Sequence, residues 1–128
     1  MDNEEHVLND TSILNDVKKI LGIDETNPDF DVDLVMAINT TLMALNQMGF
    51  GQNDFYITGE SEKWSDLLQE DEVNLHAIKT WVAFRTRMIF DPPTSNLISD
   101  AIKAAISEAE FRIYINKNYV GEINELYK

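Results

Sequence analysis

A double proline between two helix-like segments constrains the fold of this chain more than any other feature. Before the prolines, apolar positions recur at the spacing of one helix face, namely Ile78, Trp81, Val82, the stem of Arg85, Met88 and Ile89. Asp91 precedes a proline and is pushed out of the helical region, so this helix is expected to end near Phe90. Pro92 and Pro93 fix φ and remove two backbone donors. The chain is therefore predicted to turn a stiff corner here.

The segment after the corner predicts another helix, from about Ser95 to Ile115. Thr94 or Ser95 can cap it by accepting a bond from an unpaired backbone N–H group. One face would hold Ile98, Ala101, Ile102, Ala105, Ala109 and Ile113. Together with Ala104, the alanines of this segment would let a partner helix approach closely. We expect the rest of the chain to pack against this helix pair.

Two more helical segments are predicted, at about 11–21 and 31–48, and the helix before the corner is expected to begin near residue 71. Thr11 or Ser12 is expected to cap the first of them, and Gly22 stands where its left-handed end is expected. The second segment has a wide apolar stripe, which suggests burial on more than one side: Val32, Val35, Met36, Ile38, Leu42, Met43 and Leu45. Asp29, Asp31 and Asp33 at its start favour helix capping over a calcium loop, because the glycine and the closing glutamate of such a loop are missing.

The least helical part of the chain is the stretch 49–62, which three glycines punctuate. Phe55, Tyr56 and Ile57 could form a short extended segment within it. The pattern of Trp64, Leu67 and Leu68 after it predicts one turn of helix that plugs the bundle. A long loop in a small domain is often functional, but its aromatic residues more often anchor it to the core.

The last 13 residues lack a clear pattern and are interpreted as a β-hairpin, or as a helix end followed by a tail. Their apolar content is too high for a simple disordered tail: Tyr119, Val120, Ile123, Leu126 and Tyr127. We expect this segment to dock on its own subunit or on a neighbour. The predicted fold is an all-α bundle of about four helices, with a long loop between the second and third. A helical domain would cover 1–115 and a docking tail 116–128.

The net charge of −13 is spread unevenly. Residues 1–35 hold ten acidic residues against two lysines, whereas 101–128 hold four acidic and four basic residues. A surface of this sign repels phosphates. It is interpreted as a solvated, soluble face, or as a surface that meets basic partners or that DNA passes without sticking. Nucleic-acid binding is not supported, because Lys and Arg are sparse and form no stripe.

No motif in the sequence indicates catalysis, a cofactor or a metal. The chain has no cysteine, and His6 and His76 stand far apart with no second ligand at metal spacing. Phosphate-cradling loops, the serine-hydrolase elbow and the zinc-protease motif are missing. Arg85 and Arg87 are expected to pair with acidic residues of the front half. The acidic start is unlike a signal peptide, and no apolar run reaches the length of a membrane span.

Several segments, in order, resemble the head–tail connector proteins of long-tailed bacteriophages, also called adaptor or head-completion proteins. The resemblance rests on VKKILGIDE at 17–25, FDVDLVMAIN at 30–39, LNQMGFG at 45–51, Trp81 with the DPPTS corner at 91–95, and SEAEFR at 107–112. It spans about 13–115. The relatives end soon after the last of these segments, so 116–128 is an extension.

The resemblance implies a four-helix bundle that assembles, without catalysis, into a ring beneath the portal protein. This ring, a dodecamer in register with the portal, would extend the DNA channel and help to retain double-stranded DNA, which passes without sequence-specific binding. It would also be the platform for the next connector or tail-completion protein. The expected location is the neck of the virion, after assembly in the host cytoplasm, with no membrane contact. The candidate interface residues are Phe55, Tyr56, Trp64, Arg85, Arg87, Tyr119, Val120, Ile123 and Tyr127.

Two other functions are compatible with parts of the sequence. An acidic inhibitor that mimics DNA and blocks a host nuclease or repair enzyme would fit the net charge. It fits the distribution less well, because the charge is concentrated in the first 70 residues rather than along paired helical rows. A terminase small subunit would need a basic helix-turn-helix surface, and Arg85, Arg87, Lys103 and Arg112 are too few to make one.

Overall fold

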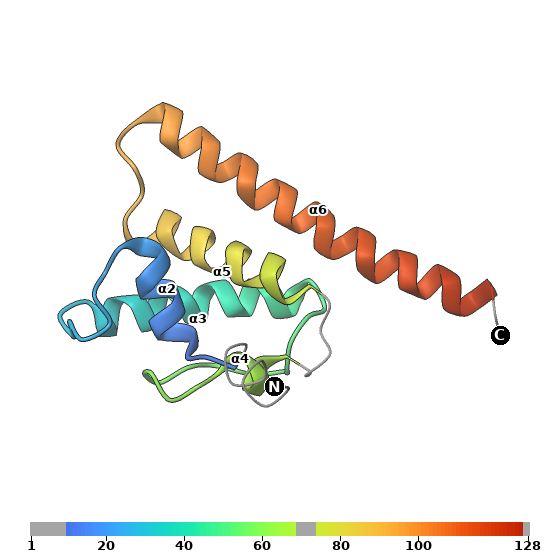
Figure 1. The fold of residues 1–128 in the computed structure, drawn as a ribbon, viewed down its shortest axis with the longest axis horizontal. Coiled ribbons are helices and arrows are strands. Elements are labelled where there is room, and N and C mark those ends of the chain that lie inside the picture. Colours follow the sequence, from blue (N-terminus) through green and yellow to red (C-terminus); the bar gives the residue numbers. More distant parts are fainter. Residues whose placement is uncertain (1–9, 69–73, 127–128) are drawn as a thin grey trace, which may run out of the picture.

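A computed structural model describes residues 10–68 and 74–126, with side chains up to residue 116. Within these ranges every regular element is a helix, which confirms the predicted all-α fold (Figure 1). The elements are α2 (Ile13–Leu21), α3 (Asp31–Gln47), α4 (Trp64–Leu67), α5 (Leu75–Phe90) and α6 (Asn96–Leu126). Helix α5 packs against α3 on one side and against α6 on the other. The short α4 lies in the long connection between α3 and α5, where a plug was predicted.

The core lies where α2, α3 and α5 meet, and α4 closes one end of it. Its largest fully buried side chains are Trp64, Trp81, Ile13, Leu14, Leu34, Ile38, Leu45, Ile57, Ile78 and Ile113. Trp64 is 1 % exposed, and its indole Nε1 donates a hydrogen bond of 2.8 Å to Asp16 of α2. The same carboxylate lies 3.6 Å from the ammonium of Lys79 on α5. One polar cluster therefore ties α2, α4 and α5 together.

Helix α2 begins and ends as its sequence predicts. The side chain of Ser12 accepts a hydrogen bond from the backbone N–H of Asn15, which satisfies one unpaired donor of the first turn. Gly22 ends the helix with φ at 80°, a left-handed conformation that glycine adopts without steric cost. Between these caps the apolar face of α2 is buried against the core.

A buried lysine holds the acidic loop that follows α2. The ammonium of Lys18 donates to the carbonyls of Glu25 (3.2 Å) and Asn27 (2.7 Å) and to the carboxylate of Asp31 (2.7 Å). All three of its donors are used, so its charge is buried with partners rather than alone. The capping prediction for α3 needs correction, because Phe30 precedes the helix and no side chain caps it. Asp31 is engaged by Lys18 instead.

The loop 49–63 is pinned to the bundle by backbone and amide hydrogen bonds. The side chain of Asn39 on α3 both donates to the carbonyl of Ile57 (3.0 Å) and accepts from its N–H (2.8 Å). An isolated antiparallel bridge joins Ser12 to Lys63, just before α4. Gly51 has φ at 79°, and a Cβ there would lie 2.7 Å from a methyl of Leu67. The loop is thus held against the bundle along its length rather than extending into solvent.

The predicted corner is confirmed. Helix α5 ends at Phe90, Asp91 has an extended φ of −148°, and α6 begins at Asn96 after the two prolines. The hydroxyl of Ser95 accepts from the N–H of Ile98 at 3.5 Å, a long bond in the expected capping position. The corner reverses the chain, so that α6 runs back along α5 (Figure 1).

The C-terminal segment is helical, which corrects the hairpin and tail interpretations. Helix α6 continues without a break to Leu126 and extends beyond the bundle (Figure 1). The helical signal was present in the sequence, since positions 116, 119, 120, 123 and 126 recur at helical spacing. Residues 116–118, where such a hairpin would have to turn, lie within the helix. The division into a domain at 1–115 and a tail at 116–128 stays a prediction.

Candidate functional site: assembly surfaces

The contact between α5 and α6, which we call the seam, explains part of the SEAEFR motif at 107–112. The indole Nε1 of Trp81 donates to Glu110 at 2.9 Å, and the guanidinium of Arg85 lies 4.9 Å from the centre of the Trp81 ring. Arg85 also lies 3.8 Å from the same carboxylate. Glu108 and Arg112 of the same motif face solvent instead, and they form an ion pair of 2.9 Å with each other, one helical turn apart. Glu110 therefore joins the two helices, whereas Glu108 belongs to the surface.

The two predicted arginines have different surroundings. Arg85 pairs with Glu110 of α6, which corrects the expectation of a partner from the front half of the chain. Arg87 is half-buried in the last turn of α5 and forms no ion pair with any residue that the structure describes. A cation in that turn interacts favourably with the helix dipole. Only Arg85 is thus fixed by neighbours.

The aromatic residues near α4 are divided between core and surface. Trp64 is fully buried and bonded to Asp16, so it presents no surface to a partner. Phe55 is half-buried and packs on the core, whereas Tyr56 beside it is largely exposed. Tyr56 is the member of this group that stands open to contact.

The candidate residues of the last segment are not brought to the others. The backbone of Tyr119, Val120 and Ile123 lies in the part of α6 that extends beyond the bundle. Their side chains, and the whole of Tyr127, lie outside the described residues. The described members of the predicted interface are spread over the loop before α4, α4 itself, α5 and the extension of α6, and their role as an interface stays a prediction. The structure also presents other surfaces that the sequence did not single out.

The first of these surfaces is an apolar row on α3, which we call the outer stripe of α3. It consists of Val32, Met36 and Met43, which are between 64 and 75 % exposed. These residues were expected inside, because the apolar stripe of α3 was taken to be buried on more than one side. The core instead covers the opposite face, through Leu34, Ile38 and Leu45 among others.

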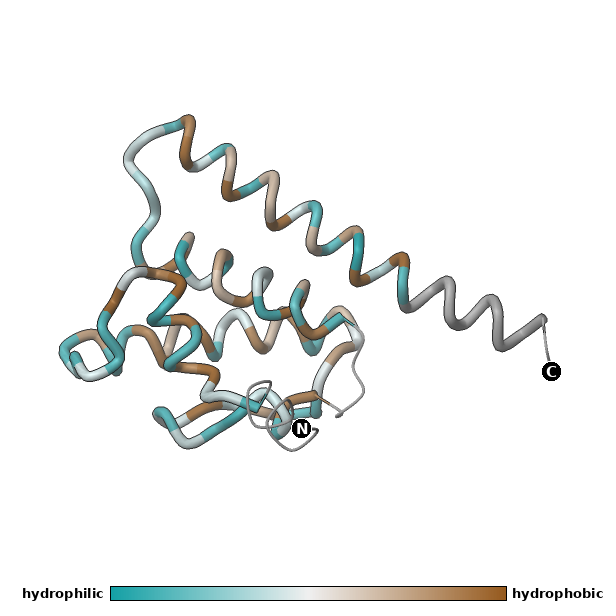
Figure 2. Tube along the Cα trace, in the orientation of Figure 1, coloured by the Kyte–Doolittle hydropathy of each residue, from teal (hydrophilic) through white to brown (hydrophobic). Residues whose placement is uncertain are grey.

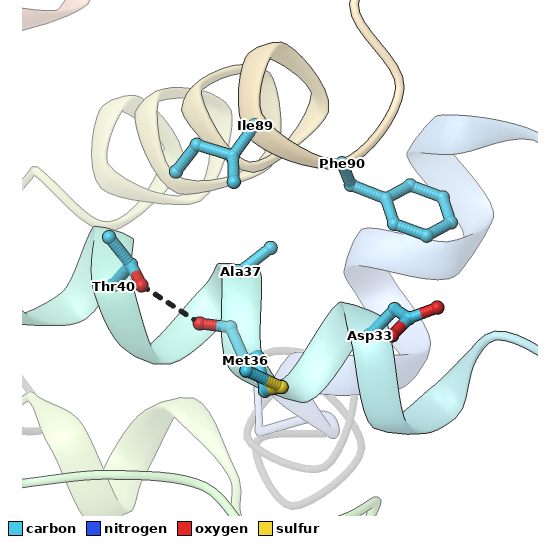
Figure 3. A pocket seen from close by; sticks show the side chains of 6 residues that line it. All are labelled: Asp33, Met36, Ala37, Thr40, Ile89 and Phe90. Atoms are coloured by element: carbon cyan, nitrogen blue, oxygen red, sulfur yellow. Dashed lines mark hydrogen bonds between the residues drawn. The ribbon is translucent and has the colours of Figure 1, made fainter.

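A shallow hollow borders the outer stripe of α3, between α3 and the end of α5 (Figure 3). Its volume is about 350 Å³, and its lining is Asp33, Met36, Ala37, Thr40, Ile89 and Phe90. Ala37 points from α3 toward α5, and Ile89 of α5 is 50 % exposed (Figure 3). The hollow is open and largely apolar, and it is bounded by a carboxylate on one side.

The second surface is an apolar row on α6, which we call the outer stripe of α6. It consists of Leu97, Ala101, Ala104, Phe111 and Ile115. All are exposed, and the three large members are 46 to 81 % exposed. The face that contacts the bundle is a different one, with Ile102, Ala109 and Ile113 buried. Figure 2 shows hydrophobic residues recurring along α6 as far as its described side chains extend.

Ala101 and Ala104 therefore differ from expectation. They were grouped with the residues that face a partner helix within the chain, but they stand on the far side of α6 from α5. The 100° step between helical residues separates the two faces. Sorting the apolar residues of α3 and α6 into two faces of each helix, rather than one, would have found both outer stripes in the sequence.

Two carboxylates have lowered pKa values, and neither lies on a stripe. Hydrogen bonds from the Thr26 hydroxyl and backbone hold the pKa of Asp24 below its ordinary value, with a smaller contribution from the charge of Lys18. Partial burial acts to raise the pKa of Glu62, but bonds from Thr58 and Gly59 outweigh it and leave the pKa lowered. Both groups stabilise loops rather than prepare a reaction.

Among the described residues no three acidic, histidine or cysteine side chains come close enough to hold a metal ion. In the same ranges no helix combines the length and the apolar content needed to cross a membrane. The surfaces that the described residues do offer are exposed apolar rows on long helices, a feature typical of proteins that bind other proteins.

Comparison with known families agrees with this class. A family model described as "Phage connector protein" matches residues 13–120, from the start of α2 into the extension of α6. The match covers most of the chain, and the chain therefore belongs to the phage connector protein family. No curated protein and no solved structure is matched. The family assignment confirms the resemblance found in the sequence and gives the protein a structural role in the phage particle. The match includes residues 116–120, which are the first five of the 13 residues of the predicted extension.

Proposed function

We propose that this protein is the adaptor ring of a phage neck. Copies assemble beneath the portal protein in a ring that follows its symmetry, extend the DNA channel and present a platform to the next connector or tail-completion protein. The observation that carries this proposal is the family match over 13–120. Two exposed apolar stripes on different helices support it, because a small domain that stays alone rarely leaves such rows uncovered.

The charge of the chain suits a channel through which DNA must slide. A net charge of −13 repels phosphates, whereas a basic lining would hold them through counterion release. Residues 1–35, which include the acidic loop after α2 and the start of α3, are the most negative part of the chain. We infer that some of these carboxylates lie near the passing DNA in the ring.

The proposal is tested by recovering the tagged full-length chain from cells infected with the phage that encodes it. Portal and tail-completion proteins are expected as the main partners, identified by mass spectrometry. A phage that lacks the gene is expected to give heads that lose their DNA and tails that stay unattached, as seen by electron microscopy. Recovery of a host nuclease or repair enzyme without any portal protein would favour the DNA-mimic inhibitor instead.

A further inference from the structure

The outer stripes of α3 and α6 share one periodicity. On α6 the stripe positions 97, 101, 104, 111 and 115 follow steps of four, three, seven and four, with the exposed Glu108 in the gap. On α3 the stripe positions 32, 36 and 43 follow steps of four and seven, and the gap holds Asn39, whose side chain is bonded to Ile57. Helices with a repeat of seven residues pack along each other at a shallow angle, with the side chains of one between those of the other. Each stripe is therefore shaped to receive a helix.

The two stripes also complement each other in size. Ala101 and Ala104 make a shallow stretch on α6 between the large side chains of Leu97 and Phe111. Met36 and Met43 on α3 are long, flexible and exposed, and methionine fills irregular gaps well. Small residues facing methionines would let the two helix axes approach closely.

Charge favours a contact between α6 of one subunit and α3 of the next over a contact between two α3 helices. Asp33 is exposed beside the start of the α3 stripe, Asp31 is already paired with Lys18, and α3 carries no basic residue. Two such stripes packed in parallel would bring like charges into contact. Helix α6 carries Arg112 beside its stripe, exposed and paired only with the exposed Glu108. An antiparallel arrangement would place Arg112 near the carboxylates of α3.

The positions of the two stripes suit a ring rather than a closed pair. Helix α5 separates α3 from α6, so the stripes belong to different surfaces of one subunit. A ring needs two different surfaces that meet head to tail between neighbours, whereas a twofold dimer uses one surface twice. We propose that the outer stripe of α6 in one subunit packs on the outer stripe of α3 in the next. This inference rests on the proposed ring function.

The contact is tested with introduced cysteines, because the chain has none of its own. Met36→Cys and Ala104→Cys are combined in one full-length chain, which is supplied to a phage that lacks the gene. Purified particles are oxidised and run on a non-reducing gel. The expected result is a ladder of dimers, trimers and larger species, because each subunit offers one cysteine to each neighbour. Ala101→Cys in place of Ala104→Cys covers a register shifted by one turn.

The single variants and an off-stripe cysteine are the controls. Neither Met36→Cys nor Ala104→Cys alone should form dimers, and Met36→Cys with Lys103→Cys should not either, since Lys103 lies on another face of α6. Monomers only, from both double variants in particles that contain the chain, would overturn the contact. Dimers from Ala104→Cys alone would overturn it too, because they mean that α6 pairs with α6. A wild-type chain that is missing from the particles would contradict the ring function instead.

A charge placed in the stripe gives a second measurement. Ala104→Glu should keep the fold, because the side chain is exposed and glutamate suits a helix, but it should remove the chain from particles. Lys103→Glu is the matched control and should be incorporated like the wild type. Circular dichroism of both purified variants verifies that the helices are retained. Normal incorporation of Ala104→Glu would contradict the proposed contact.

Discussion

The body formed by α2 to α5 and the long helix α6 are stabilised in different ways. In the body, apolar side chains of α2, α3, α4 and α5 make up most of one core, and even the buried Lys18 has a partner for each of its donors. Helix α6 has 31 residues and packs mainly against α5; up to residue 116 its buried side chains lie on one face, from which Ala109 and Ile113 join the core. Its hold on the body is a short row of apolar contacts and the bonds of Glu110 and Asn116.

The difference suggests a division of work. A body that already buries most of its apolar side chains in one core gains little further stability from covering its surface. A helix that is packed on one side and apolar on the other is stabilised further only when its outer face is covered. Helix α6, which has an apolar face that no other part of the described chain covers, therefore carries one of the two surfaces that we assign to assembly.

The largest expected effect is a loss of stability in the body formed by α2 to α5. Ile38→Ala removes a fully buried side chain of α3 and should lower the free energy of unfolding by about 2–5 kcal/mol, because a cavity remains in a closely packed core. Met36→Ala on the same helix removes an exposed side chain and should change stability by less than about 0.5 kcal/mol. Denaturant unfolding followed by circular dichroism measures both. Equal losses would mean that the outer stripe of α3 is part of the core.

A smaller effect is expected at the seam that holds α6. Glu110→Ala removes the acceptor of the buried Trp81 indole and one partner of Arg85, which should cost about 1 kcal/mol. Glu108→Ala, two residues away, removes only an exposed pair within α6 and should cost about 0.3–0.5 kcal/mol. The same unfolding measurement applies. If Glu108→Ala proved the more costly, the assignment of the two carboxylates to seam and surface would be reversed.

The smallest expected effect is the contribution of Glu62 to the stability of the body, and it depends on pH. Because the pKa of Glu62 is lowered in the folded state, its carboxylate stabilises the protein at pH values above its unfolded pKa, near 4.5. This contribution is lost as the pH falls through the lower folded-state pKa. Glu62→Gln should therefore be less stable than the wild type at neutral pH. The stability gap should narrow in acid, as unfolding curves at several pH values would reveal; a constant gap would contradict the role of the charge.

Much of the fold follows from short-range signals in the sequence. The double proline ends α5 and positions α6 because φ is fixed locally and two donors are lost. Gly22 and Ser12 define α2 for similarly local reasons. Trp64 was predicted as a plug, and also named as an interface residue, because a large apolar residue in a long loop suits both roles. Its burial and its bond to Asp16 depend on α2, which is 48 residues away.

The sequence by itself determined the helical class, the corner, the caps of α2 and the family, since each depends on neighbouring residues or on motifs in order. The tertiary structure decided which apolar face of each helix is covered. Periodicity groups residues into faces, but which face is buried depends on where distant helices lie. Leu34 and Val32 stand two residues apart on α3, and only the packing of α2 and α5 buries the first and leaves the second open. The surfaces that we assign to assembly are those left over when the core was complete.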